Sequence, residues 1–302
     1  MHISTLLRGC MVASLTAVSS FSFAQKVVTT EKTGQLETLI SEAEREKTPS
    51  LQVVGPINGE DIQVIRTMCG RDYSGYESEG TTRTLDLSEA LIKQEAGKNY
   101  LNEQLGFYNR FYAPSADNEI GIKMFYRCEP LREIILPKTT TVIAGQAFDN
   151  CTSLTKCTFF AGLTTIRQYA FRNTKLAEVE LPSTLTAMEN KVFDGCKELT
   201  TVMFTSKAVP TLPDELFPNC PKLKTVIVPE ESLAAYTAAL KLPEGVTIEG
   251  RAGIAAVRSA AASAAVVEVA RFDLQGRRLA QPQKGVNIVR YSNGTTAKVV
   301  VR

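Results

Sequence analysis

Hydrophobic residues recur along the middle of the chain with a fixed, long period. The unit runs Ile-x(4)-Phe-x-x-Cys-x-x-Leu-x-x-Val-x-Leu, and its phenylalanines are Phe125, Phe148, Phe171, Phe193 and Phe217. The steps between them are 23, 23, 22 and 24 residues. A unit of this length cannot bury its own apolar side but can stack on its neighbours, so the period predicts a solenoid of successive coils.

The end of each unit alternates between apolar and polar positions, which predicts a short strand with one side in the core. We expect these strands to pair in parallel from coil to coil, with the Phe-x-x-Cys stretch as the return path. The residues between the core positions then form two outward ladders, and these are candidate binding residues. They are Glu133, Lys156, Glu178 and Thr201 in one ladder and Ile135, Thr158, Glu180 and Met203 in the other.

The residues on either side of the clear copies predict caps for the solenoid. Residues 25–118 form an irregular cap and first coils, and residues 119–250 hold the repeats and a closing helix. The expected elements are a helix over Gly34–Lys47, a strand at Leu51–Val53, a helix over Asn58–Cys69 with Asn58 as its N-cap, and an amphipathic helix over Glu231–Leu240.

An insertion at about 92–118 interrupts the early repeats and is rich in aromatic residues. They are Tyr100, Phe107, Tyr108, Phe111 and Tyr112. Aromatic residues gathered on a loop are typical of a binding surface, and on this interpretation Tyr108, Phe111 and Tyr112 contact a ligand. The alternative is that the rings pack back on the first coil.

Both ends of the chain differ from the repeats. Arg8, the apolar run Met11–Val18 and small residues at Ser22 and Ala24 predict an export signal at 1–24, cleaved before Gln25. Residues 251–302 predict an Ala/Ser-rich linker and a small antiparallel β module, with Asn293-Gly294 as a hairpin turn. No later run is long and apolar enough to predict a transmembrane segment.

Composition and charge exclude several classes of function. The 34 Lys+Arg against 32 Asp+Glu leave a net charge of +2, so no basic field indicates a nucleic-acid partner. The single histidine, His2, lies in the expected signal, which excludes histidine-based catalysis and imidazole-ligated zinc. The acidic pairs Glu60-Asp61 and Glu230-Glu231 lie beside helix starts, where they favour the helix dipole. We therefore expect no enzyme, no catalytic residue, no cofactor and no metal site.

Six cysteines follow the expected signal, at positions 69, 128, 151, 157, 196 and 220. An even number in an exported chain favours disulfides. However, four of them share one repeat phase, where equivalent residues of stacked strands lie about 4.8 Å apart. Because bridged Cβ atoms lie about 3.5–4.5 Å apart, the spacing favours free, buried cysteines.

Two stretches resemble known families. The string Ala147-Phe-x-x-Cys-x-x-Leu154 resembles the BspA-like leucine-rich repeats, which occur in surface-exposed and secreted bacterial proteins that bind host or matrix proteins. The stretch Phe272-Asp-Leu-Gln-Gly-Arg-Arg-Leu279, with the Gly285 strand and the terminal Lys-Val-Val-Val-Arg, is similar to the sorting domain of the type IX secretion system. The alternative for this module is a β cap that the protein keeps.

These resemblances imply an α/β repeat solenoid of the leucine-rich-repeat class, with short parallel strands and a small C-terminal antiparallel β module. They further imply an exported, adhesin-like protein at the cell surface or outer membrane, or secreted, with an extracellular or surface protein or glycan as ligand. The alternatives are a structural scaffold of an envelope assembly and an accessory subunit of a carbohydrate-active system.

Overall fold

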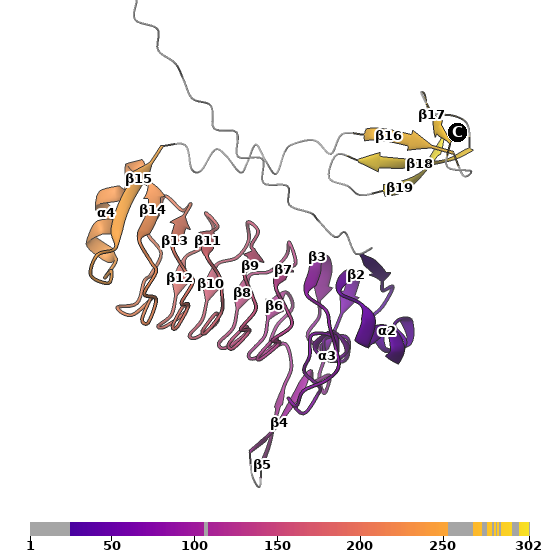
Figure 1. Ribbon diagram of the computed structural model, residues 1–302, viewed down its shortest axis with the longest axis horizontal. Coiled ribbons are helices and arrows are strands. Elements are labelled where there is room, and N and C mark those ends of the chain that lie inside the picture. Colours follow the sequence, from indigo (N-terminus) through magenta and orange to yellow (C-terminus); the bar gives the residue numbers. More distant parts are fainter. Residues whose placement is uncertain are drawn as a thin grey trace, which may run out of the picture.

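A computed structural model describes residues 25–105, 108–252, 268–273, 277–279, 281, 283, 285–291 and 296–301 (Figure 1). The expected export signal, the Ala/Ser-rich linker, Phe107 and the Asn293-Gly294 turn lie outside these residues. Within the described ranges, no helix has the length and apolar character needed to cross a bilayer.

Short parallel strands form one row along the repeats and continue into the N-terminal residues (Figure 1). One sheet has the order β1-β2-β3-β7-β9 and a second has the order β11-β13-β14-β15. Their bounds are β1 (Lys26–Thr29), β2 (Ser50–Ile57), β3 (Thr84–Ile92), β7 (Glu133–Ile135), β9 (Lys156–Thr158), β11 (Glu178–Leu181), β13 (Thr201–Phe204), β14 (Thr225–Pro229) and β15 (Thr247–Arg251). The expected parallel, in-phase pairing is confirmed, because Glu133 lies opposite Lys156 and Val179 opposite Val202.

A second row of two-residue strands lies on another side of the coils (Figure 1). In chain order they are β6 (Glu119–Ile120), β8 (Val142–Ile143), β10 (Thr165–Ile166) and β12 (Ala187–Met188), and all pair in parallel. The sequence pattern did not predict them. Two residues are too few to show an alternation of apolar and polar positions. The apolar residue that begins each copy is the one sequence feature at the position of these strands.

A left-handed turn recurs at the same phase of four copies, between these short strands and the phenylalanine. Lys123, Gln146, Tyr169 and Lys191 all have φ between 56° and 60°. For residues other than glycine this conformation costs roughly 1–2 kcal/mol each. Bonds between coils offset that cost, because the N–H of Lys123 donates to Gly145 over 3.2 Å and that of Gln146 donates to Gln168 over 3.0 Å.

The five repeat phenylalanines form a stacked column inside the coils. Their ring centroids lie 5.3, 5.1, 5.8 and 5.8 Å apart in succession, and their planes deviate from parallel by 15° or less. All five side chains are buried. Such offset contacts add to the apolar area that the rings bury, so the column runs through the core of the repeats.

The cysteines of the repeat phase are buried beside this column and are free, as the spacing predicts. Each thiol from the second copy onward donates to the carbonyl of the phenylalanine one coil earlier. The bonds are Cys151 to Phe125 at 2.9 Å, Cys196 to Phe171 at 3.1 Å and Cys220 to Phe193 at 3.0 Å. These bonds between coils give the buried thiols a partner, so the cysteine position has a structural role.

Helices close both ends of the solenoid, with two departures from expectation. At the N-terminal end, α1 (Leu36–Leu39) and α2 (Glu42–Lys47) replace the single expected helix, and α3 (Gly59–Met68) follows β2. The break lies at Ser41, whose N–H and hydroxyl both donate to the Glu44 carboxylate and so start a new helix. The cap at Asn58 is confirmed, because its side chain accepts from the N–H groups of Glu60 and Asp61.

At the other end, the expected capping helix is a 3-10 turn, η1 (Glu230–Ser232), followed by α4 (Leu233–Ala239). Tyr236 of α4 is buried and its hydroxyl donates to the Ser206 carbonyl over 2.9 Å. The solenoid does not end there, however. The chain returns as β15 and pairs with β14, a coil that the sequence analysis missed.

The insertion forms an antiparallel hairpin of β4 (Leu101–Leu105) and β5 (Tyr108–Tyr112), which projects from the side of the coils (Figure 1). The C-terminal residues form a separate antiparallel sheet of order β17-β16-β18-β19. Its strands are β16 (Glu268–Phe272), β17 (Arg278–Leu279), β18 (Gly285–Tyr291) and β19 (Thr296–Val301).

Candidate binding surface

The outward ladders of the strand row lie where the repeat pattern places them. Glu133, Lys156 and Glu178 are exposed, and the other five candidates are half-buried. In-phase pairing aligns equivalent residues, so Glu178 lies beside Thr201 and Glu180 beside Met203. The Lys156 ammonium lies 3.8 Å from the Glu133 carboxylate of the preceding coil.

The row of strands is interrupted between β9 and β11. The third copy reads Thr174-Lys-Leu176 where the second reads Cys151-Thr-Ser-Leu154, so it reaches its strand one residue early. At the preceding junction, the N–H groups of Thr155 and Lys156 both donate to the Arg132 carbonyl.

In the shortened copy a different bond takes this place, from the N–H of Lys175 to the Leu154 carbonyl over 2.9 Å. β9 is the last strand of one sheet and β11 is the first strand of the next, with no ladder between these two described strands. A missing residue shifts the strand register, so the deletion accounts for the interruption.

A hollow of about 510 Å³ lies at the interruption. Seven of the eight ladder candidates line it: Glu133, Lys156, Thr158, Glu178, Glu180, Thr201 and Met203. Ile135 is the exception and lies outside it. The lining also includes Thr155, Cys157, Phe159, Ala177 and Val179, which the repeat pattern does not place on the outward ladders. The sequence feature that could have indicated these residues is the shortened spacing between Thr174 and Leu176.

The interruption exposes part of the core, and the exposure of Cys157 shows this. Its equivalents Ile134, Val179 and Val202 are at most 5% exposed, whereas Cys157 is half-buried. Burial nevertheless raises the pKa of the Cys157 thiol well above its usual range. The thiol is therefore protonated at neutral pH and serves as a weakly polar wall of the hollow instead of a nucleophile.

The aromatic hairpin divides into an exposed part and a buried part. Tyr108 is 77% exposed and Phe111 is 55% exposed, so both rings are available for contact. Tyr112 is only 6% exposed, and its hydroxyl donates to the Glu103 carboxylate over 2.8 Å. Tyr112 is therefore not a candidate binding residue. Its ring packs back on the coils, as the ring of Tyr100 does, which is the alternative that the sequence left open.

Lys123 fixes the base of this hairpin to the first clear repeat. Its ammonium donates to both Glu103 oxygens at 2.7 Å and lies over the rings of Tyr112 and Tyr126, 5.4 and 5.1 Å from their centroids. Burial raises the pKa of Glu103, but the hydrogen bonds from Lys123 and Tyr112 outweigh it, and the net shift is downward. These contacts of Lys123 thus attach the hairpin to the repeats at its base and leave its tip exposed.

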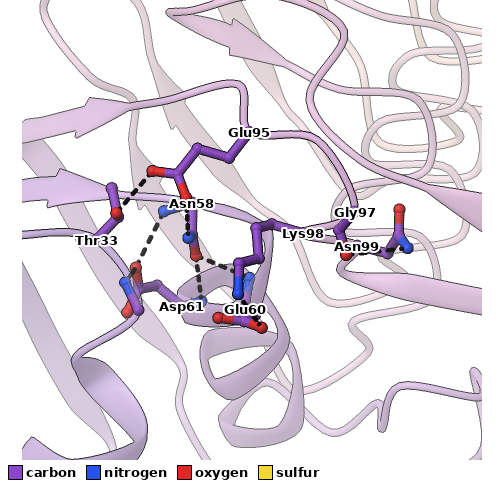
Figure 2. Close-up of polar contacts among 9 residues, drawn as sticks. Thr33, Asn58, Glu60, Asp61, Glu95, Gly97, Lys98 and Asn99 are labelled. Atoms are coloured by element: carbon purple, nitrogen blue, oxygen red, sulfur yellow. Dashed lines mark hydrogen bonds and ion pairs between the residues drawn. The ribbon is translucent and has the colours of Figure 1, made fainter.

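The acidic side chains at the start of α3 have a structural role (Figure 2). Asp61 accepts bonds from the N–H groups of Gly34, Leu36 and Asn58 at 2.6, 2.9 and 3.0 Å. Glu95 accepts from the Thr33 hydroxyl and the Asn58 amide.

Glu60 of the same group pairs with Lys98 over 2.8 Å, and Figure 2 shows this pair beside the helix start. All three carboxylates thus have partners, and their bonds join the loop after β1, α1, the start of α3 and the loop after β3. In the described part of the chain, no cluster of three or more His, Cys, Asp or Glu side chains could hold a metal ion.

Comparison with known protein families finds a match for the repeats. Residues 118–241 match the family described as BspA type leucine rich repeat region, in 6 copies. No curated protein sequence matches the chain.

Among solved structures, the chain resembles a leucine-rich-repeat protein of T. pallidum with 23% identity and a TM-score of 0.34, over 57% of this chain and 75% of that one. It also resembles a leucine-rich repeat protein from Bacteroides ovatus with 18% identity and a TM-score of 0.39, over 68% of this chain and 51% of that one. The pneumococcal vaccine antigen PcpA matches with 13% identity and a TM-score of 0.36, over 68% of this chain and 64% of that one. The chain thus spans between half and three quarters of these proteins.

Proposed function

We propose that this chain, whose residues 118–241 are BspA-type leucine-rich repeats, is an exported, non-catalytic protein that binds an extracellular or surface protein or glycan. The observation that carries the proposal is the hollow in the strand row, where seven outward residues from four successive coils converge. Concave sites with a few polar groups over an apolar floor are where proteins bind ligands. The proposed binding surface comprises this hollow and the neighbouring Ile135.

The exposed tip of the β4–β5 hairpin is a second proposed contact. Tyr108 and Phe111 present large rings to solvent, and aromatic side chains supply much of the energy of protein interfaces. Arg110 and Asn109 beside them are exposed as well and can bond to polar groups at the rim of an interface.

The route out of the cell belongs to the same proposal. The segment at 1–24 acts as the export signal, and the C-terminal sheet of β16–β19 acts as a sorting domain of the type IX kind. Fractionation of cells, with sequencing of both ends of the mature protein, tests this. An extracellular protein that starts at Gln25 and lacks the residues after about 252 supports it, and an intact chain inside the cell contradicts it.

Binding is tested with immobilised extracellular-matrix proteins and a glycan array. We expect the full chain to bind at least one of these ligands. The double variant Glu178→Lys/Glu180→Lys reverses charge in the hollow and should abolish that binding. Glu249→Lys is the matched control, because Glu249 lies on the same outward ladder at β15, opposite Ile227 and away from the hollow. Equal binding by both variants would contradict the proposed face.

The hairpin is tested in the same assay with Tyr108→Ser/Phe111→Ser. Both side chains are exposed, so the fold should be unaffected while binding weakens. Unchanged binding would remove the hairpin from the proposed surface.

A further inference from the structure

A shallow groove lies beside the short strands β8, β10 and β12, which Figure 1 shows on another side of the coils from β9 and β11. It consists of two hollows, of about 420 and 400 Å³, and its walls are residues that end or follow the short strands. The two hollows share Gln168 and Glu189, so they form one groove across successive coils, which we call the short-strand groove. None of its lining residues lines the hollow between β9 and β11.

Polar side chains form the centre of the short-strand groove. Arg167, Gln168 and Asn190 are exposed, and none of them has a side-chain bond to any residue that the structure describes. Where the two hollows meet, the N–H of Gln168 donates to the Glu189 carboxylate over 2.9 Å, which holds these two residues together. Amide and guanidinium groups offer several donors each, and the amides accept as well. The groove can therefore bond to a ligand that carries many hydroxyl groups.

Tyr169 supplies an aromatic surface in the larger hollow. The Arg172 guanidinium lies over its ring, 4.6 Å from the centroid, and two bonds to the buried Asp149 carboxylate hold that guanidinium in place. The ring is half-buried and also lines the groove. An aromatic face is negative and attracts the weakly positive C–H groups of a sugar ring. Because Tyr169 is already held in position, it loses little freedom when a ligand binds.

The distribution of charge and apolar surface favours a neutral glycan over a peptide or a nucleic acid. Arg167 and Glu189 are the two charged residues in the lining, so their charges cancel. Protein interfaces draw most of their energy from a desolvated, largely apolar centre. Here the centre is formed by Gln168 and Glu189, which are polar and exposed. Two hollows in succession further favour an extended chain of sugar units over a single small molecule.

We infer that the short-strand groove is a second binding site and takes a neutral, linear glycan. One sugar ring lies on Tyr169, and hydroxyl groups bond to Arg167, Gln168 and Asn190. This site is separate from the hollow between β9 and β11 and does not depend on a ligand there.

The test uses the full chain, labelled with ¹⁵N, and the hexasaccharides of amylose, cellulose, chitin and mannan. We expect at least one of them to shift the amide signals of residues 146, 167–169 and 189–190. The hexasaccharide of hyaluronan carries carboxylates and serves as the acidic comparison, which should bind more weakly. Binding by none of the neutral hexasaccharides, or shifts confined to other parts of the chain, would overturn the inference.

Two variants test the contacts. Gln168→Ala/Asn190→Ala removes two side chains that have no partner among the described residues, so it should weaken hexasaccharide binding about tenfold without affecting the fold. Tyr169→Ala should weaken binding roughly fivefold. Tyr76→Ala is the matched control, because it removes a ring that is 62% exposed and lies outside the groove. Binding that is unchanged in the first two variants would contradict the inference.

A third variant separates this inference from the proposed function. Glu178→Lys/Glu180→Lys changes the other hollow, so hexasaccharide binding should be unchanged. If this variant loses the hexasaccharide while Gln168→Ala/Asn190→Ala keeps it, the glycan binds between β9 and β11; the inference then fails and the proposed function stands. If no hexasaccharide binds at all, the inference fails, and the matrix-protein assay still decides the proposed function.

Discussion

The Cys151 thiol donates a hydrogen bond over 2.9 Å to the backbone carbonyl of Phe125 in the preceding coil. We expect Cys151→Ala to lower the free energy of unfolding by about 1–3 kcal/mol, because it removes this bond and leaves a small cavity. Cys157→Ala should cost less, since that side chain is half-buried. Urea denaturation of both variants under reducing conditions measures the difference, and equal losses would contradict a structural role for the thiol column.

An ion pair between a buried carboxylate and a half-buried guanidinium joins the second and third copies. The Asp149 carboxylate is fully buried and accepts two bonds from the Arg172 guanidinium, at 2.9 and 2.6 Å. Removing the arginine leaves a buried negative charge, so Arg172→Ala should cost about 3 kcal/mol. Thermal unfolding checks this. The exposed pair of Lys222 and Glu198 is the control, and Lys222→Ala should cost about 1 kcal/mol or less.

Acid should loosen the hairpin before the repeats. The pKa of Glu103 is lowered in the folded protein by Lys123 and Tyr112. A lowered folded pKa contributes stability that is present above the unfolded value of about 4.3 and is lost as the pH falls through the folded value. We therefore expect the amides at 101–105 and 108–112 to lose protection against exchange below about pH 4, when each rate is compared with the intrinsic rate at the same pH. In Glu103→Gln this pH dependence should be absent, and an unchanged pH profile would contradict the anchor.

The period of the phenylalanines was enough to place the repeat strands, the outward ladders and the free cysteines. These features depend on apolar residues that recur at a fixed position of each copy, such as Phe148 and Leu154. Because each coil stacks only on its neighbours, these residues must all face the shared core. Asn58 was identified as a cap for a similar reason, since its amide satisfies N–H groups that a helix start leaves open.

The features that were missed depend on competition between local and distant bonds. Ile40 continues the helical spacing, yet Ser41 bonds to Glu44 and divides the helix in two. Tyr112 looks like its neighbour Phe111 in the sequence, but in the fold it joins the core and its hydroxyl bonds to Glu103. The hollow follows from a single absent residue after Thr174, whose effect on two sheets could be read only once their ladders were known.

We infer that the shortened third copy opens the binding hollow. Inserting one serine between Thr174 and Lys175 restores the spacing of the second copy, and it should let β9 and β11 form a ladder. The decisive measurement is the affinity of this insertion variant for the matrix or glycan ligand, with amide exchange at Cys157–Phe159 to report the ladder. We expect slowed exchange together with loss of ligand binding. Slowed exchange with ligand binding at full strength would contradict the role of the hollow.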